Sequence, residues 1–193
     1  MLLTLHISLA YSQNPVIWRR ICIDDDETFA SLHAVIQAAF GWSNAHLWEF
    51  FIPGRPPVRI GGAFEDDWGD APEYNVFDTP LSMFLKQKGS ALTYMYDFGD
   101  SWNHLIKVEK KEDIPQARPT CIDGAGACPP EDCGGIPGYE HLQKVIKDPR
   151  HNEYQHMRDW LELEEEENWD PHAFDLAEAQ SRMCWYSLCL GSL

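Results

Sequence analysis

Hydrophobic and polar residues alternate along several stretches of the chain, as they do in strands that bury one face. At the amino end, every second residue from Leu3 to Leu9 is aliphatic, and the residues between them are polar. A period of two is typical of a half-buried β-strand. This alternation, or an aromatic-rich run of strand length, predicts strands over 2–9, 16–23, 47–52, 92–97 and 103–109.

Other stretches repeat hydrophobic residues at helical spacing. Thr28 suits an N-cap, and apolar residues from Leu32 to Phe40 precede Gly41, so we expect a core helix over 29–40. Similar spacing predicts a short helix over 80–86, helices from Tyr139 to Ile146 and from Tyr154 to Leu161, and a last helix from Pro171 to about Cys184. The segments 53–78 and 110–138 are rich in loop-forming residues and lack an apolar period, so both are expected to be loops.

Consecutive strands with short links favour antiparallel pairing. The sequence therefore predicts an α+β fold: one domain over 1–193, with a largely antiparallel sheet, helices packed on one face and a long loop rich in Pro, Gly and Cys. The apolar tail 185–193 is expected to pack as a terminal segment.

The composition fits one folded core, since 44% of the 193 residues are hydrophobic. The formal charge is −16, from 31 acidic and 15 basic residues, and this disfavours direct binding to nucleic acids. The amino end resembles a strand more than an export signal, and no stretch has the roughly 20 apolar residues that span a bilayer. We therefore expect a cytoplasmic protein without a membrane partner.

Acidic and imidazole groups gather at the tip of the hairpin predicted between 92–97 and 103–109. Asp97, Asp100 and His104 lie within eight residues, and a carboxylate beside an imidazole can prepare a general base or a metal ligand. They are the candidate catalytic residues. The alternative is structural: both aspartates cap loop amides, and His104 hydrogen-bonds in a partly polar core.

A second candidate surface is the run Pro129-Pro-Glu-Asp-Cys-Gly-Gly135. Its prolines stiffen one half, while its glycines allow the backbone to bend. Glu131 and Asp132 would form an acidic rim or, alternatively, cap the following helix. Aromatic residues outside regular core spacing often line binding surfaces. The predicted binding residues are Tyr96, Trp102, Glu131, Asp132 and Tyr139.

The 110–138 loop carries three cysteines, Cys121, Cys128 and Cys133, whose spacing does not match the common zinc modules. They are candidate zinc ligands, with His104, His141, His151 or His156 as a fourth. Because prolines and aromatic anchors can also order such a loop, we expect reduced thiols and neither metal nor another cofactor.

The run Tyr94 to His104, the run Pro129 to Gly135 and the segment His46-Leu-Trp-Glu-Phe50 resemble a known family. It is the plasmid open-reading-frame-three-like family, first noted on a root-inducing plasmid and often carried by mobile elements. The resemblance runs from about Leu3 to Phe174. It implies a compact α+β domain whose biochemical role is unassigned.

Three functions follow as hypotheses. The first is a cytoplasmic binding module that recognises an unknown protein or small molecule through the hairpin tip and the Pro-Pro-Glu-Asp loop. The second is a hydrolase or metal-assisted enzyme in which His104 acts with Asp97 or Asp100. The third is an accessory protein associated with nucleic acids.

Overall fold

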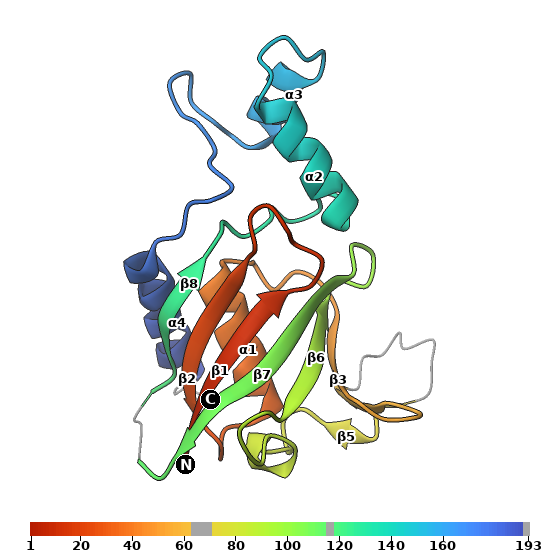
Figure 1. Cartoon of the computed structure of the whole chain (residues 1–193), viewed down its shortest axis with the longest axis vertical. Helices are drawn as coiled ribbons and strands as arrows, with labels where there is room; N and C mark the ends of the chain where they lie inside the picture. Colours follow the sequence, from red (N-terminus) through yellow and green to blue (C-terminus); the bar gives the residue numbers. More distant parts are fainter. Residues whose placement is uncertain (63–70, 115–117, 191–193) are drawn as a thin grey trace.

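Figure 1 shows a computed structural model in which a large sheet has a helix behind it and a helical arm beyond one end. The structure describes residues 1–62, 71–114 and 118–190, with side chains through residue 184.

Within these residues the sheet has eight strands. They are β1 (Leu2–Leu9), β2 (Trp18–Asp24), β3 (Trp48–Ile52), β4 (Val58–Gly61), β5 (Tyr74–Asn75), β6 (Ala91–Tyr96), β7 (Trp102–Glu112) and β8 (Thr120–Ala125). Their spatial order is β5-β4-β3-β6-β7-β1-β2-β8. Every neighbouring pair is antiparallel except β4 with β5, which confirms the predicted α+β fold and largely antiparallel sheet.

The helices of the described residues are α1 (Phe29–Phe40), α2 (Gly135–Ile146), α3 (Tyr154–Trp160) and α4 (Leu176–Leu190), and Leu81–Met83 form one 3-10 turn. The cap residues of α1 are those expected from the sequence. The Thr28 hydroxyl accepts a hydrogen bond from the Ser31 backbone N–H, and Gly41 ends the helix with a φ of 100°.

The hydrophobic core lies between α1 and the face of the sheet that α1 covers (Figure 1). Leu3, Leu5 and Ile7 of β1 are fully buried, whereas His6 and Ser8 point to the other face and are partly exposed. α4 lies beside α1, and Arg182 of α4 donates to the Ala38 carbonyl at 2.8 Å. The hydrophobic pattern of the sequence therefore identified the buried face correctly.

Both segments predicted as loops contain strands. β8 lies inside 110–138 and pairs with β2, while β4 and β5 lie inside 53–78. β8 lacks apolar alternation because its segment is short, includes Asp123 and Gly124, and stands at an edge of the sheet. Gly124 is required there, since a Cβ atom at this position would lie 2.7 Å from the Phe174 ring.

Two predicted helices differ in extent. The segment 80–86 forms only one 3-10 turn, at Leu81–Met83. The last helix begins at Leu176 rather than Pro171 and continues to Leu190, so most of the tail 185–193 is helical. Residues 191–193 lie outside the described residues.

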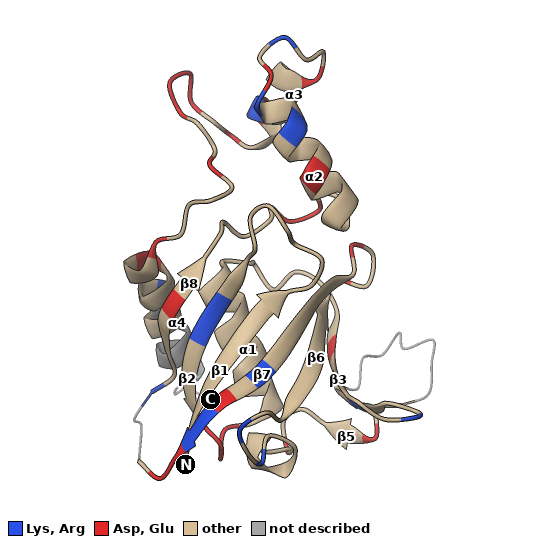
Figure 2. Ribbon diagram, in the orientation of Figure 1, with Lys and Arg blue, Asp and Glu red and all other residues tan. Residues whose placement is uncertain are grey.

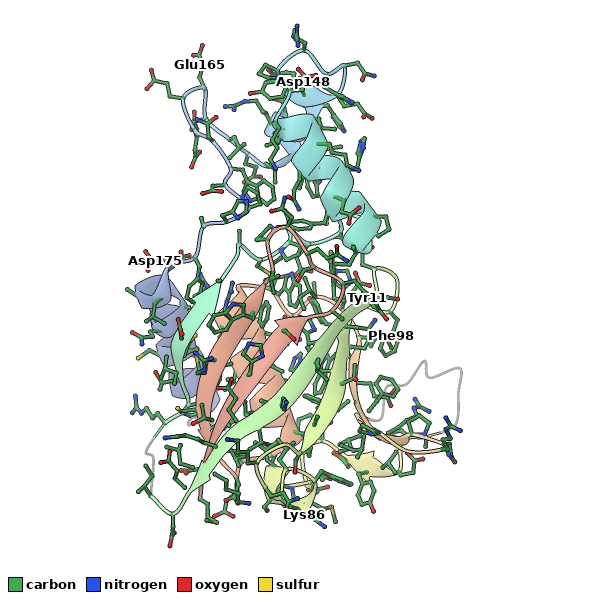
Figure 3. The ribbon with its side chains drawn as sticks, in the orientation of Figure 1. Tyr11, Lys86, Phe98, Asp148, Glu165 and Asp175 are labelled. Carbon is green, nitrogen blue, oxygen red and sulfur yellow. The ribbon has the colours of Figure 1, made fainter. Side chains whose placement is uncertain are left out.

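Helices α2 and α3 do not cover a face of the sheet. They form an arm beyond its end (Figure 1). Asp148 and Glu165 lie at the far side of this arm (Figure 3). Arg158 of α3 is buried and donates to the backbone carbonyls of Glu164, Glu165 and Glu167, which holds the acidic segment against the arm. None of the helices in the described residues has the length and apolar character needed to cross a membrane.

Candidate functional site

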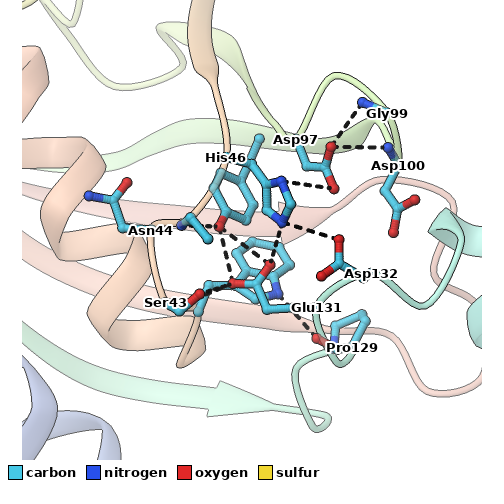
Figure 4. Close-up of polar contacts among 12 residues, drawn as sticks. Ser43, Asn44, His46, Asp97, Gly99, Asp100, Pro129, Glu131 and Asp132 are labelled. Atoms are coloured by element: carbon cyan, nitrogen blue, oxygen red, sulfur yellow. Dashed lines mark hydrogen bonds and ion pairs between the residues drawn. The ribbon is translucent and has the colours of Figure 1, made fainter.

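Three segments that are distant in the sequence converge at one end of the sheet (Figure 4). The first is 43–46, between α1 and β3; the second is the hairpin tip 97–101, between β6 and β7; the third is the loop 129–134, before α2. Four side chains meet there: His46, Asp97, Glu131 and Asp132. These four residues are called the His46 cluster below.

His46 lies at the centre of the cluster. Its Nδ1 is 3.8 Å from Asp97 Oδ2, and its Nε2 is 3.3 Å from Asp132 Oδ1 and 3.6 Å from Glu131 Oε2. The segment that carries His46 is fixed to α1, because the Asn44 backbone N–H donates to Gln37 Oε1 at 3.0 Å. One imidazole thus faces carboxylates on both of its nitrogen atoms.

Asp97 follows β6 directly and has a φ of 55°, a left-handed conformation that aspartate tolerates well. Its backbone N–H donates to the Leu47 carbonyl at 2.9 Å. Its Oδ1 accepts from the backbone N–H groups of Gly99 at 2.9 Å and Asp100 at 3.3 Å. These bonds fix the carboxylate and direct Oδ2 toward His46 (Figure 4).

Glu131 is held by donors from the other segments. Its Oε1 accepts from the Ser43 backbone N–H at 2.8 Å, the Ser43 hydroxyl at 3.0 Å and the Tyr96 hydroxyl at 3.1 Å. Burial, together with the charge of Glu131, raises the pKa of Tyr96. Tyr96 therefore stays protonated and serves as a donor that positions Glu131.

The hairpin tip and the 129–134 loop are joined by backbone contacts. The Gly134 N–H donates to Asp100 Oδ2 at 3.0 Å. Gly135 has a φ of 66°, and a Cβ atom there would lie 2.6 Å from the Asp100 carbonyl oxygen. Only glycine allows the two segments to approach this closely.

His104 does not take part in this cluster. It lies on the buried face of β7 with an exposed fraction of 0%, and the rings of Phe40, Trp42 and Tyr94 surround it at centroid distances of 4.9, 5.1 and 5.4 Å. Burial lowers the pKa of His104 to about 3, although the nearby backbone of Tyr94 and Trp102 opposes this effect.

The predicted acid–base pair of His104 with Asp97 or Asp100 is therefore not formed. Alternation along β7 places the imidazole in the core, while Asp97 turns to His46 and Asp100 to Gly134. His104 is a neutral core residue, and His46 is the histidine that the hairpin tip contacts.

The predicted binding residues divide into two groups. Glu131 and Asp132 belong to the cluster, and the side chain of Asp132 is 72% exposed. Tyr96, Trp102 and Tyr139 are buried. Tyr96 reaches the cluster through its hydroxyl group, whereas Trp102 packs on Trp42 with centroids 6.1 Å apart and Tyr139 on Trp169 at 5.8 Å.

The three candidate zinc ligands occupy different environments. Cys121 is fully buried in β8, and its thiol donates to the Asp123 carbonyl at 3.4 Å. Cys128 and Cys133 are partly buried in the loop that follows β8. Burial raises the pKa of all three thiols, that of Cys133 to about 12, and nearby acidic groups add to the effect at Cys133.

Within the described part of the chain, the thiols do not share a group of three or more residues with the spacing of metal ligands. The one such group consists of His46, Asp97 and Asp132, whose ligand atoms lie within 4.8 Å of one another. Of the histidines proposed as a fourth zinc ligand, His141 and His151 instead approach Glu153, at 3.0 and 3.9 Å.

Comparison with known proteins gives a consistent assignment. Residues 1–178 match the family described as plasmid pRiA4b ORF-3-like protein. The chain is 34% identical over 148 residues to uncharacterized protein y4hQ of Sinorhizobium fredii (strain NBRC 101917 / NGR234). The aligned region covers 76% of this chain and 74% of y4hQ.

A solved structure supports the same relationship. The crystal structure of the protein of unknown function MM3350 from Methanosarcina mazei Go1 is similar, with a TM-score of 0.75 and 34% sequence identity. The similarity covers 92% of this chain and 95% of MM3350. The chain belongs to the plasmid pRiA4b ORF-3-like family.

Proposed function

We propose that this protein is a cytoplasmic binding module and that its ligand presents a positive charge to the His46 cluster. The observation that carries this proposal is the collection of three carboxylates around one imidazole. Binding surfaces are commonly built on loops that a rigid scaffold positions, as these three segments are.

The charge of the cluster is poorly compensated. Among the described residues, His46 is the one ion-pair partner within 4.0 Å of Asp97, Glu131 or Asp132. Carboxylates elsewhere have stronger bases: Asp25 contacts Lys111 at 2.7 Å, and Glu109 contacts Arg20 at 2.7 Å. Three carboxylates that share one histidine as partner attract cations and repel anions.

The surface beside the cluster has room for an organic part of the ligand. Asp132 borders a pocket of about 190 Å³ between α2 and α3, whose lining includes Cys133, Leu142, Met157 and Trp160. A basic side chain or an amine with an apolar group could therefore place its charge at the carboxylates and its carbon atoms against Trp160.

Direct binding to a nucleic-acid backbone has less support. The cluster has the same sign of charge as phosphate, and three of the arginines that could form a basic patch are buried or paired. Arg19 is buried, Arg20 is paired with Glu109 and Asp123, and Arg59 is paired with Glu49.

Hydrolysis is a second candidate, supported by the contact between His46 and Asp132 at 3.3 Å. A carboxylate in this position can orient an imidazole for acid–base work. If the protein hydrolyses p-nitrophenyl esters, we expect His46→Gln to abolish the activity and His104→Leu to preserve it. Equal loss in both variants would remove His46 from this role.

The binding proposal is tested by calorimetric titration with three cationic probes: hexalysine, spermidine and a divalent metal ion. Hexaglutamate serves as the anionic control. We expect at least one cation to bind, Asp132→Asn to weaken that binding, and Glu165→Gln, at the far side of the arm, to leave it unchanged. If no cation binds, or if both variants behave alike, the proposal is wrong.

A further inference from the structure

We propose that His46, Asp97 and Asp132 bind a first-row divalent transition-metal ion. This inference rests on the proposed function, because it names the cation that the cluster receives. Each of the three residues supplies one ligand atom, and these atoms lie within 4.8 Å of one another. Ligand atoms bound to one ion at about 2.1 Å lie roughly 3–4 Å apart. Asp97 and Asp132 contact different ring nitrogens of His46, so side-chain rotation must bring both carboxylates to the nitrogen that binds the ion.

One buried polar atom of the cluster, His46 Nε2, lacks a hydrogen-bond partner, and a carboxylate oxygen near it makes only a long contact. Asp97 has an exposed fraction of only 7%, and its Oδ2 lies 3.8 Å from His46 Nδ1, beyond hydrogen-bonding distance. His46 Nε2 is buried and makes no hydrogen bond with a described residue. Such atoms are rare in folded proteins, and an ion is one of the partners that satisfy them.

The other groups of the site hold the ligands in place. Backbone N–H groups of Gly99 and Asp100 occupy Asp97 Oδ1, which leaves Oδ2 for an ion. Ser43 and Tyr96 donate hydrogen bonds to Glu131 and hold its Oε2 3.6 Å from His46 Nε2. The charge of Glu131 therefore lies beside the proposed ion. Hydrogen bonds that orient ligands in this way are a regular feature of metal sites.

Access to the site is open on one side. Asp97 lies at the base, whereas the side chain of Asp132 is 72% exposed. An ion can therefore enter past Asp132 and keep water on its outer positions. Three protein ligands with remaining open positions are typical of sites at which a metal binds a further molecule.

The ligand set indicates which ions are suitable. Imidazole binds Zn²⁺ and other first-row transition-metal ions, whereas carboxylates also bind Mn²⁺ and Mg²⁺. One imidazole with two carboxylates is therefore better suited to Mn²⁺ or Zn²⁺ than to Ca²⁺, which takes six to eight oxygen ligands.

The experiment is a titration of the full chain with Mn²⁺, followed by electron paramagnetic resonance, and with Zn²⁺, followed by calorimetry. Asp132→Asn is the main variant, because this exposed side chain contacts only His46 among the interactions described and its loss should not unfold the protein. His141→Gln is the matched control, since His141 also faces a carboxylate, that of Glu153, at 3.0 Å.

We expect one Mn²⁺ or Zn²⁺ per chain, with affinity at least about tenfold lower in Asp132→Asn and in His46→Gln, because losing even an orienting partner costs roughly 10–100-fold. His141→Gln should bind as the native protein does. In nuclear magnetic resonance spectra, the ring resonances of His46 should broaden when Mn²⁺ is added to the native protein. The same His46 resonances should broaden less in a folded Asp132→Asn variant.

The outcomes separate this inference from the proposed function. Absence of stoichiometric binding by both ions, or equal binding in Asp132→Asn, contradicts the metal site. If hexalysine or spermidine nevertheless binds and Asp132→Asn weakens that binding, the proposed function holds and only the metal assignment is wrong. If no cation of any kind binds, both are wrong.

Discussion

Two histidines show how the same residue type acquires different chemistry from its surroundings. His46 contacts carboxylates at the surface, whereas His104 is enclosed by aromatic rings. The sequence favoured His104 because acidic residues precede it closely along the chain. His46 has no such neighbours, since its partners come from the hairpin tip and from the 129–134 loop. Proximity in sequence therefore favoured a histidine that lies outside the candidate site.

Part of the site could nevertheless be predicted from local chemistry. Asp97 was a candidate because its carboxylate lies close to His104 along the chain, and Glu131 and Asp132 were candidates because they lie on a loop stiffened by proline. What local chemistry could not supply was the approach of the two loops, which depends on contacts such as that of Gly134 with Asp100. The run that contains His46 was indicated only by the family resemblance.

The burial of His104 leads to a prediction about pH. Its pKa is about 3 in the folded protein, lowered from about 6.5, and His33 has the same shift. Below about pH 6.5 the unfolded chain binds protons that the folded protein excludes, so stability falls as the pH falls toward 3. Each histidine contributes a slope of about 1.4 kcal/mol per pH unit in this window.

We therefore expect His104→Leu to reduce the dependence of the unfolding free energy on pH between about 6 and 4. Urea denaturation at several pH values measures this slope. Val108→Ala controls for lost packing, because Val108 lies fully buried on the same face of β7 and does not titrate. A His104→Leu slope equal to that of the native protein would contradict the assigned pKa.

At the scale of elements, segments with a clear hydrophobic period were predicted correctly, whereas some strands without such a period were predicted as loops. β1 and α1 bury one face each, and their patterns gave their ranges closely. β8 is held by ladder hydrogen bonds to β2, which any sequence can make, so its composition did not reveal it. The same reason explains why β4 and β5 were predicted as loop.

The contact between the hairpin tip and the start of α2 gives a second prediction. Gly135→Ala places a Cβ atom 2.6 Å from the Asp100 carbonyl, at a φ of 66°. Gly89→Ala is matched in conformation, with a φ of 89°, but meets no atom within 4 Å. The left-handed backbone alone costs an alanine roughly 1–2 kcal/mol.

We expect Gly89→Ala to lose about that amount of stability and to bind cations normally. Gly135→Ala should lose more stability and should also weaken cation binding, because the clash separates Asp97 from Asp132. Denaturation and the Mn²⁺ titration measure the two effects. Equal behaviour of the two variants would show that the close approach is unimportant to the site.

The helical arm gives a third prediction. Arg158 donates to three backbone carbonyls of the segment 164–167, although all four residues of that segment are exposed glutamates. Arg158→Met should release this segment and speed amide hydrogen exchange over 161–169. Arg150→Met is the control, because Arg150 is 93% exposed. Similar exchange in both variants would contradict the role of Arg158.

At the scale of the whole molecule, the excess of negative charge is spread over several elements. Acidic residues occur on the arm, the loops and the sheet edges (Figure 2), and the formal charge is −16. Like charges on a compact surface repel one another and reduce stability. The hydrophobic core must offset this repulsion. In the His46 cluster, three carboxylates converge with one histidine as their partner.

General repulsion and specific cation binding predict different responses to salt. Raising NaCl from about 10 to 100 mM shortens the screening length from about 30 to 10 Å, so the melting temperature should rise in the native protein and in Asp132→Asn alike. At constant ionic strength, Mn²⁺ should raise it further only where it binds the folded state, as linkage requires. Differential scanning fluorimetry should therefore show an Mn²⁺-dependent increase in the native protein that Asp132→Asn reduces and Glu165→Gln retains. An increase of the same size in all three proteins would mean that Mn²⁺ acts elsewhere on the folded protein, not at the His46 cluster.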